Sequence, residues 1–247
     1  MLMELGKETE KPEKPEKPEK PEKKVKSKMR VRSGKRKMVG IYLAAGSSRR
    51  MGTAKQALEL AGISLGGIAL LKALGCAAFE HVVVVVCEGD TLAWLPEEAR
   101  HELESGRCRI VVCPEASLGM AHSLRMGIHA AGELEADGAM VMLADQPFIE
   151  AAMLDGLIDA YEAGVEVEYD YVASGDKGIP KPPVILGSGM WSDIASLEGD
   201  AGARALFHLP AFNGQIIEAA ELTFMDIDTA QGYEEAKAIY KDLYTSY

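Results

Sequence analysis

The stretch that most constrains the fold runs from Met38 to Leu58 and reads MVGIYLAAGSSRRMGTAKQAL. It begins with an apolar run over residues 39–43, as a buried β-strand does. The chain then becomes small, polar and basic over residues 44–52, and Lys55 follows. This change predicts a strand that runs directly into a glycine- and serine-rich loop.

Such a loop suits a polyphosphate, because small residues let backbone N–H groups approach phosphate oxygens and basic side chains neutralise their charge. The alternative is an ordinary turn with a solvated arginine pair. Strand, small residues, Arg50, Gly52 and Lys55 follow one another in an order that favours the polyphosphate site. The loop carries neither the Walker pattern nor the G-x-G-x-x-G dinucleotide fingerprint.

The stretch resembles the LAAGxSxRMGxxK signature of the MobA-like nucleotidyltransferases. Within them it is most similar to molybdenum cofactor cytidylyltransferases and the related accessory proteins of xanthine dehydrogenase. The matching residues are Leu43, Ala44, Ala45, Gly46, Ser48, Arg50, Met51, Gly52 and Lys55. The resemblance implies that Arg50 and Lys55 are catalytic, and that the other matching residues except Met51 bind the nucleotide. It covers residues 38–247 and implies a single-domain, Rossmann-like α/β fold of the nucleotide-diphospho-sugar transferase type.

Length and composition agree with one sizeable α/β domain, since 47% of the 247 residues are hydrophobic. No apolar run approaches the ~20 residues of a transmembrane helix, and no secretory signal is recognisable. We therefore expect a cytoplasmic protein that does not bind membranes. The four cysteines are scattered without a C-x-x-C pair, which favours thiols in a reducing compartment over disulfides or a metal site.

Charge divides the chain at residue 37. Residues 1–37 repeat Glu-Lys-Pro, carry a net charge of +7 and have too few apolar residues for a core, which predicts a disordered tail. The tail is either a basic arm for a membrane or partner, or a dispensable extension. Residues 38–247, the predicted nucleotidyltransferase domain, keep a net charge of −18. So acidic a domain argues against binding nucleic acid.

Predicted strands and helices alternate along this domain, which indicates a mostly parallel sheet with helices on both faces. The strands are expected near residues 81–87, 108–113, 138–144, 169–174, 178–186 and 222–229. The helices are expected near residues 64–78, 94–105, 151–164 and 233–244. Another is expected to follow a loop that contains Ser123 and to run to about residue 132, and a further helix is opened by residues 198–204.

Two aspartates stand where such a sheet binds ligands. Asp145 ends a buried strand, and ligands of open α/β sheets lie at the carboxyl ends of strands. A turn or helix cap is the alternative role. Its LADQP sequence resembles the family's L-x-D-x-P motif, which implies Mg²⁺ ligation. Asp228, in a stretch that resembles the family's D-I-D-T-P with Ala230 in place of proline, is the expected second metal ligand. Thr229 beside it suits a helix cap.

Three further elements resemble substrate-binding parts of the family. Ser123 lies in a G-M-x-x-S-L-x-x-G element, whose loop in the family faces the nucleotide base. Lys181 and Pro183 lie in a Gly-x-Pro-x-x-Pro-Val element, where Pro182 replaces the usual histidine; Lys181 either meets an anionic acceptor or is solvated. Asp200 and Arg204 match G-D-x-G-A-R, which suits an anionic acceptor; a helix cap followed by a structural salt bridge is the alternative.

The resemblance implies that an acceptor phosphate displaces pyrophosphate from a nucleoside triphosphate. It implies CTP, because Ala45 would narrow the base pocket, and Mo-molybdopterin as the acceptor, with Mg²⁺ as the metal. A molybdenum hydroxylase apoenzyme such as xanthine dehydrogenase would be the partner. Two alternatives stay open: a nucleotidyltransferase acting on a sugar or polyol phosphate, and a maturation chaperone that delivers the cofactor without transferring a nucleotide.

Overall fold

The computed structural model describes residues 35–46 and 55–244. Within these residues, seven strands form a sheet in the order β5-β4-β1-β6-β8-β7-β9. The strands are β1 (Met38–Leu43), β4 (Phe79–Cys87), β5 (Cys108–Cys113), β6 (Gly138–Leu143), β7 (Tyr171–Asp176), β8 (Ile179–Gly187) and β9 (Gly214–Glu218). Only β8 is antiparallel to its neighbours β6 and β7, and the other neighbouring pairs are parallel. The prediction of a mostly parallel sheet is therefore confirmed.

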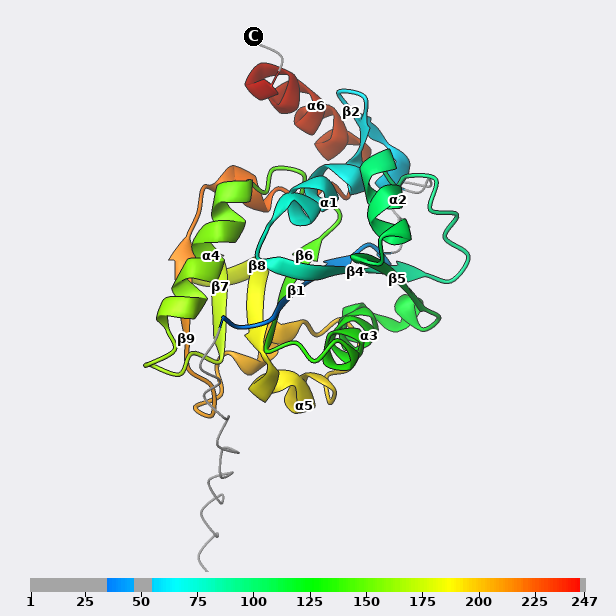
Figure 1. Ribbon diagram of the computed structural model, residues 1–247. Helices are drawn as coiled ribbons and strands as arrows, with labels where there is room; N and C mark the ends of the chain where they lie inside the picture. The colour runs from blue at the N-terminus through cyan, green and yellow to red at the C-terminus, as the bar shows by residue number, and fades with distance from the viewer. Residues whose placement is uncertain (1–34, 47–54, 245–247) are drawn as a thin grey trace, which may run out of the picture. The chain divides into compact units, whose positions relative to one another are not determined.

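Helices cover both faces of this sheet, also as predicted (Figure 1). One face carries α1 (Leu65–Gly75), α2 (Glu97–Glu104) and α4 (Ala151–Ala163), and the other carries α3 (Met120–Glu133) and the short α5 (Trp191–Ile194). Strand β1 supplies both cores in alternation, because side chains of a strand point to opposite faces. Met38 and Tyr42 pack with the first group of helices, whereas Ile41 packs with the second.

In a smaller third core, the C-terminal helix packs against a short hairpin and the helix that follows this hairpin. It contains α6 (Ala230–Tyr244), the two-residue strands β2 (Glu59–Leu60) and β3 (Ile63–Ser64), and the start of α1. Ile227, which is fully buried, packs in this core just ahead of α6. No helix of the described part is long and apolar enough to cross a membrane.

The predicted strand at residues 222–229 is wrong. Residues Glu221–Phe224 form a 3-10 turn, η5, and the next residues make no ladder; the Ile227 N–H donates to the Asp145 carbonyl instead (3.1 Å). The edge strand β9 was not foreseen. Residues 214–218 become a strand because they pair with β7, which lies about 40 residues earlier in the sequence. A pairing over that distance leaves no local pattern from which the strand could be predicted.

The helix expected at residues 198–204 is also wrong. The chain makes a loop there, followed by the short 3-10 turn η4 (Ala203–Leu206). Gly199 adopts a left-handed backbone conformation with φ of 58°. Its carbonyl accepts a hydrogen bond from the Ala121 N–H at the start of α3 (3.0 Å). A continuous helix is incompatible with that conformation and that contact.

Candidate active site

The candidate site lies where β1 and β6 end side by side. The two strands are parallel and aligned, with Leu43 opposite Leu143, so the residues after each leave the sheet at the same edge. The chain runs outward from β1 to β4 and β5, then returns to β6 on the other side of β1. This reversal is a topological switch point, the usual ligand position in open α/β sheets.

A side-chain hydrogen bond connects the end of β1 to the turn that follows the loop after it. Gln56, in the 3-10 turn η1 (Lys55–Ala57), is buried, and its Nε2 donates to the Ala44 carbonyl (2.9 Å) and approaches that of Gly46 (3.5 Å). This hydrogen bond places Lys55 beside the end of β1. Sequence reasoning did not single out Gln56. Ser48, Arg50 and Gly52, which carry predicted roles, lie outside the described residues.

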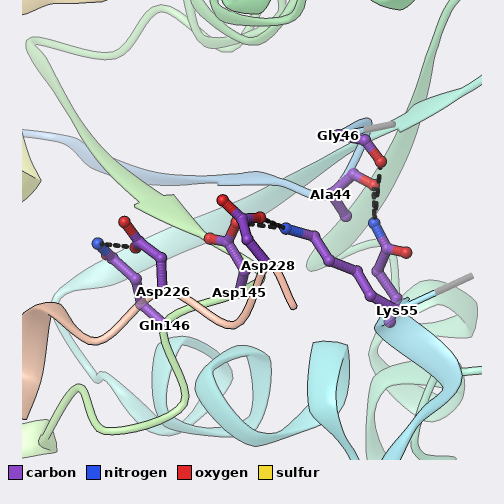
Figure 2. Close-up of polar contacts among 8 residues, drawn as sticks. Ala44, Gly46, Lys55, Asp145, Gln146, Asp226 and Asp228 are labelled. Carbon is purple, nitrogen blue, oxygen red and sulfur yellow. Dashed lines mark hydrogen bonds and ion pairs between the residues drawn. The ribbon is translucent and has the colours of Figure 1, made fainter. Parts of the chain in front are cut away.

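Lys55 points at two carboxylates from distant parts of the chain (Figure 2). Its side chain is 8% exposed, and its Nζ lies 2.6 Å from Asp145 Oδ2 and 2.7 Å from Asp228 Oδ1. Burial disfavours the charged ammonium, but the charges and hydrogen bonds of Asp145 and Asp228 outweigh it and raise the pKa of Lys55. The three residues thus form a partly buried cluster of one ammonium and two carboxylates at the carboxyl edge of the sheet.

The two carboxylates also suit a metal ion bound together with phosphates. Among the described residues, the buried Asp145 Oδ1 has no hydrogen-bond partner, whereas the Asp228 side chain is 47% exposed. A buried carboxylate oxygen without a donor is costly unless a cation or water meets it. Mg²⁺ typically uses one or two carboxylates plus substrate phosphates and water. In the described part of the chain, no group of three or more His, Cys, Asp or Glu side chains could by itself hold a metal.

A second polar contact links the same two segments. Gln146 follows Asp145, and its Nε2 donates to Asp226 Oδ1 (2.9 Å), two residues before Asp228 (Figure 2). Asp226 keeps an exposed edge, but partial removal from water, and then the charge of Asp145, raise its pKa. In the sequence, Gln146 stands inside the LADQP stretch and Asp226 opens the stretch that resembles D-I-D-T-P, but neither was assigned a role.

The predicted nucleotide-binding residues directly after β1 differ in their exposure to solvent. The side chains of Leu43, Ala44 and Ala45 are buried in the two main cores. Gly46 is exposed, and a Cβ added there would meet nothing within 4 Å. Ala45 is 4% exposed and packs in the core on the α3 side of the sheet.

Ser123 and Asp200 come from segments that lie in contact. Ser123 was expected in the loop before a helix, but it is buried within α3, which already begins at Met120. The exposed Asp200 follows Gly199, whose carbonyl accepts a hydrogen bond from the start of that helix. The approach is close at Gly119, where an added Cβ would lie 2.2 Å from the Gly199 carbonyl carbon. Arg204 is exposed in η4.

Lys181 reaches toward the segment that carries Asp228. Its Nζ pairs with Asp176 (3.0 Å) and lies 4.9 Å from the centre of the Phe224 ring, four residues before Asp228. Pro183 is buried in β8, so its side chain belongs to the sheet's packing. Among the described residues, the structure therefore brings Lys55, Asp145 and Asp228 into direct contact. Of the predicted acceptor residues, Lys181 pairs with Asp176, and Asp200 lies in the loop that contacts the start of α3.

A mostly parallel sheet with a lysine and two aspartates at its switch point defines an α/β protein of the nucleotidyltransferase type. Residues 40–216 match the family described as the MobA-like NTP transferase domain. The chain belongs to this family of nucleotidyltransferases, as the signature after β1 led us to expect.

Two relatives and one solved structure illustrate the match. Purine catabolism protein PucB of Bacillus subtilis (strain 168) is 32% identical over 200 residues, 80% of this chain and 94% of PucB. Nicotine blue oxidoreductase of Paenarthrobacter nicotinovorans is 29% identical over 201 residues, 78% of this chain and 93% of that protein. The crystal structure of a Mycobacterium tuberculosis rv0371c homolog from Mycobacterium sp. strain JC1 has a TM-score of 0.65 at 26% identity, covering 83% and 98% of the two chains.

Proposed function

We propose that the protein transfers CMP from CTP to the terminal phosphate of Mo-molybdopterin and releases pyrophosphate. The observation that carries the transfer reaction is the contact of Lys55 with Asp145 and Asp228 at the switch point. CTP and the acceptor are proposed from the family resemblance, and the similarity to a protein named for purine catabolism supports a link to xanthine oxidation.

In the proposed reaction, an oxygen of the acceptor phosphate attacks the α-phosphorus of CTP. A new P–O bond forms while the bond to the bridging oxygen of the β-phosphate breaks, and pyrophosphate leaves with that electron pair. Such a displacement depends mainly on positioning and charge neutralisation. A phosphate monoester is already anionic near neutral pH, so no general base is needed. The Lys55 ammonium would stabilise the charge of the phosphates, and Arg50 is proposed to share this role.

Asp145 and Asp228 are the proposed ligands of Mg²⁺. When bound, this ion would neutralise charge on the triphosphate oxygens. The buried Asp145 Oδ1 without a partner supports this role. The exposed side of Asp228 supports a site that opens toward the substrate.

The acceptor is proposed to bind on the side of Lys181, Asp200 and Arg204. Pro183 would act by shaping β8, because it is buried. The contact of Lys181 with Phe224 supports this placement, since it directs the lysine to the segment that leads to Asp228. We further propose that the protein works in the cytoplasm and delivers its product to the apoenzyme of a molybdenum hydroxylase.

The test measures pyrophosphate release with Mg²⁺ and each of the four ribonucleoside triphosphates, with and without Mo-molybdopterin. Release with CTP that requires the pterin, stops with EDTA and returns with Mg²⁺ is expected. If pyrophosphate release required a sugar or polyol phosphate instead, Mo-molybdopterin would be ruled out as the acceptor in favour of that phosphate. Binding of the pterin without pyrophosphate release would favour the delivery chaperone.

One relative is named an oxidoreductase, so a redox control belongs to the same assay. The absorbance of NADH and NADPH is followed in parallel reactions that contain Mo-molybdopterin but no nucleoside triphosphate. Oxidation of either cofactor, in the absence of pyrophosphate release from any triphosphate, would contradict the proposed transfer reaction.

A further inference from the structure

The segment that carries Asp228 has little regular structure to hold it. It lies between η5 and α6 and belongs to no strand. Its position relative to Asp145 therefore depends on individual contacts. The backbone supplies one of them, the hydrogen bond from the Ile227 N–H to the Asp145 carbonyl (3.1 Å). Packing of the Ile227 side chain in the third core supplies another.

Gln146 adds a side-chain contact from the neighbouring position. It is 2% exposed, and the partner found for its amide is the Asp226 carboxylate, 2.9 Å from Nε2. A carboxylate can accept but not donate, so Nε2 must face Asp226. The buried Oε1 atom is consequently left without a hydrogen-bond partner within the part of the chain that the structure describes. An apolar side chain would fill this space without that cost.

We propose that Gln146 is a positioning residue whose hydrogen bond to Asp226 fixes the 226–228 segment and thereby sets the spacing of the Asp145 and Asp228 carboxylates. The consequence for metal binding rests on the proposed function, whereas the consequence for the segment itself does not. Gln146 acts through Asp226 and touches neither substrate nor metal. Figure 2 shows its amide turned toward Asp226, while the ammonium of Lys55 points at the carboxylates of Asp145 and Asp228.

The first experiment needs no substrate. Amide hydrogen exchange is measured for the peptide 225–229 in the full chain and in the variants Gln146→Leu and Asp226→Asn. Gln146→Leu keeps the buried volume but removes the donor, so the Ile227 amide should exchange roughly tenfold faster, as expected for losing a hydrogen bond to a charged group. Asp226→Asn keeps an oxygen for Gln146 Nε2 and should exchange nearly as slowly as the parent protein. Gln215→Leu, an exposed change on β9, is the matched control.

A reversed pair checks that the hydrogen bond itself matters. Gln146→Glu alone places two carboxylates against each other and should give the fastest exchange. Adding Asp226→Asn supplies a new donor to Glu at position 146 and should restore slow exchange. Unchanged exchange at 225–229 in both Gln146→Leu and Gln146→Glu would overturn the proposal, whatever reaction the protein performs.

The second experiment measures Mn²⁺ binding in the presence of a non-hydrolysable CTP analogue. Gln146→Leu should weaken Mn²⁺ binding roughly tenfold while kcat at saturating metal changes little, because a misplaced ligand costs affinity before it costs chemistry. Asp228→Asn changes a proposed metal ligand and should lower both the affinity for Mn²⁺ and kcat. Loss of Mn²⁺ binding in Asp226→Asn as severe as in Asp228→Asn would show that Asp226 is itself a ligand and would overturn the positioning role. Failure of the parent protein to bind Mn²⁺ with any nucleotide would instead count against the proposed function.

Discussion

Lys55 is a cation whose charge is satisfied, in the absence of substrate, by the two carboxylates beside it. A phosphate group that enters the site would compete with Asp145 and Asp228 for the same ammonium. An ammonium on a flexible stem can change partners by rotating about its side-chain bonds. The cluster thus holds a positive charge in place at the position where the triphosphate is proposed to bind.

Replacing Lys55 by methionine should lower kcat/KM by on the order of 10²-fold or more, because stabilisation of developing negative charge is lost. Steady-state pyrophosphate release measures the effect. Lys177→Met, at a lysine whose side chain is 79% exposed, is the control and should behave like the parent protein. An unchanged kcat/KM in Lys55→Met would remove Lys55 from the mechanism.

Asp145→Ala should abolish turnover while leaving the fold intact. The change removes the buried oxygen proposed to meet the metal and one of the two anions that compensate Lys55. Circular dichroism reports the fold, and pyrophosphate release reports turnover at increasing Mg²⁺. A folded variant with Mg²⁺-dependent turnover would refute the metal assignment.

At the scale of elements, the start of α3 and the loop after Glu198 are matched by a close backbone approach. Gly119 has a φ of 128°, a region that side chains rarely adopt, and its missing Cβ leaves room for Gly199. The contact joins the helix that carries Ser123 to the loop that carries Asp200. Any side chain at position 119 must therefore move one of these two elements.

Gly119→Ala should destabilise the protein by more than Gly62→Ala, which is the matched control. Both glycines have positive φ, but a Cβ at Gly62 meets nothing within 4 Å. The control isolates backbone strain, about 1 kcal/mol or slightly more, and the excess at Gly119 reports the displaced loop. For a domain of this size each kcal/mol lowers Tm by roughly 2–4 °C. Equal melting temperatures for the two variants would contradict the close approach.

The elements also show what sequence patterns can and cannot predict. The strand of residues 38–43 was recognisable because the signature that contains it is local and continuous. Asp145 and Asp228 were found because each stands in a short motif at a strand end or its equivalent. Strand β9 and the irregular 226–228 segment were missed, since their conformations are set by β7 and by Asp145, far away in sequence. Gln146 was missed because one buried amide makes no pattern.

At the scale of the whole molecule, the first described residues, 35–37, make contacts with later elements of the domain. The Arg36 guanidinium lies 4.2 Å from the centre of the Tyr161 ring and donates to the Tyr161 carbonyl (3.0 Å). Lys37 exchanges two hydrogen bonds with Asp137, one of them through the Asp137 carboxylate. These contacts belong to the domain, although composition alone drew its boundary after Lys37.

Two truncations test that boundary. Removing residues 1–34 should leave Tm and pyrophosphate release unchanged, because we propose that the repetitive tail contributes nothing to catalysis. Removing residues 1–37 should lower Tm by several degrees through loss of the Arg36 and Lys37 contacts. A large loss of activity in the shorter truncation would assign the tail a function.

Strand β8 runs antiparallel to its neighbours and separates β5, β4, β1 and β6 from β7 and β9 in the sheet order. Lys55 and Asp145 belong to the segments that follow β1 and β6, whereas Lys181 lies in β8 and Arg204 lies after it. Asp228, the second proposed metal ligand, also comes from the later part of the chain but contacts Lys55 (2.7 Å). On the proposed function, substitutions at Lys181 and Arg204 would therefore change the choice of acceptor, whereas the residues that hold the nucleotide and its metal would stay the same. One scaffold could then serve different acceptors through a few changes on that side.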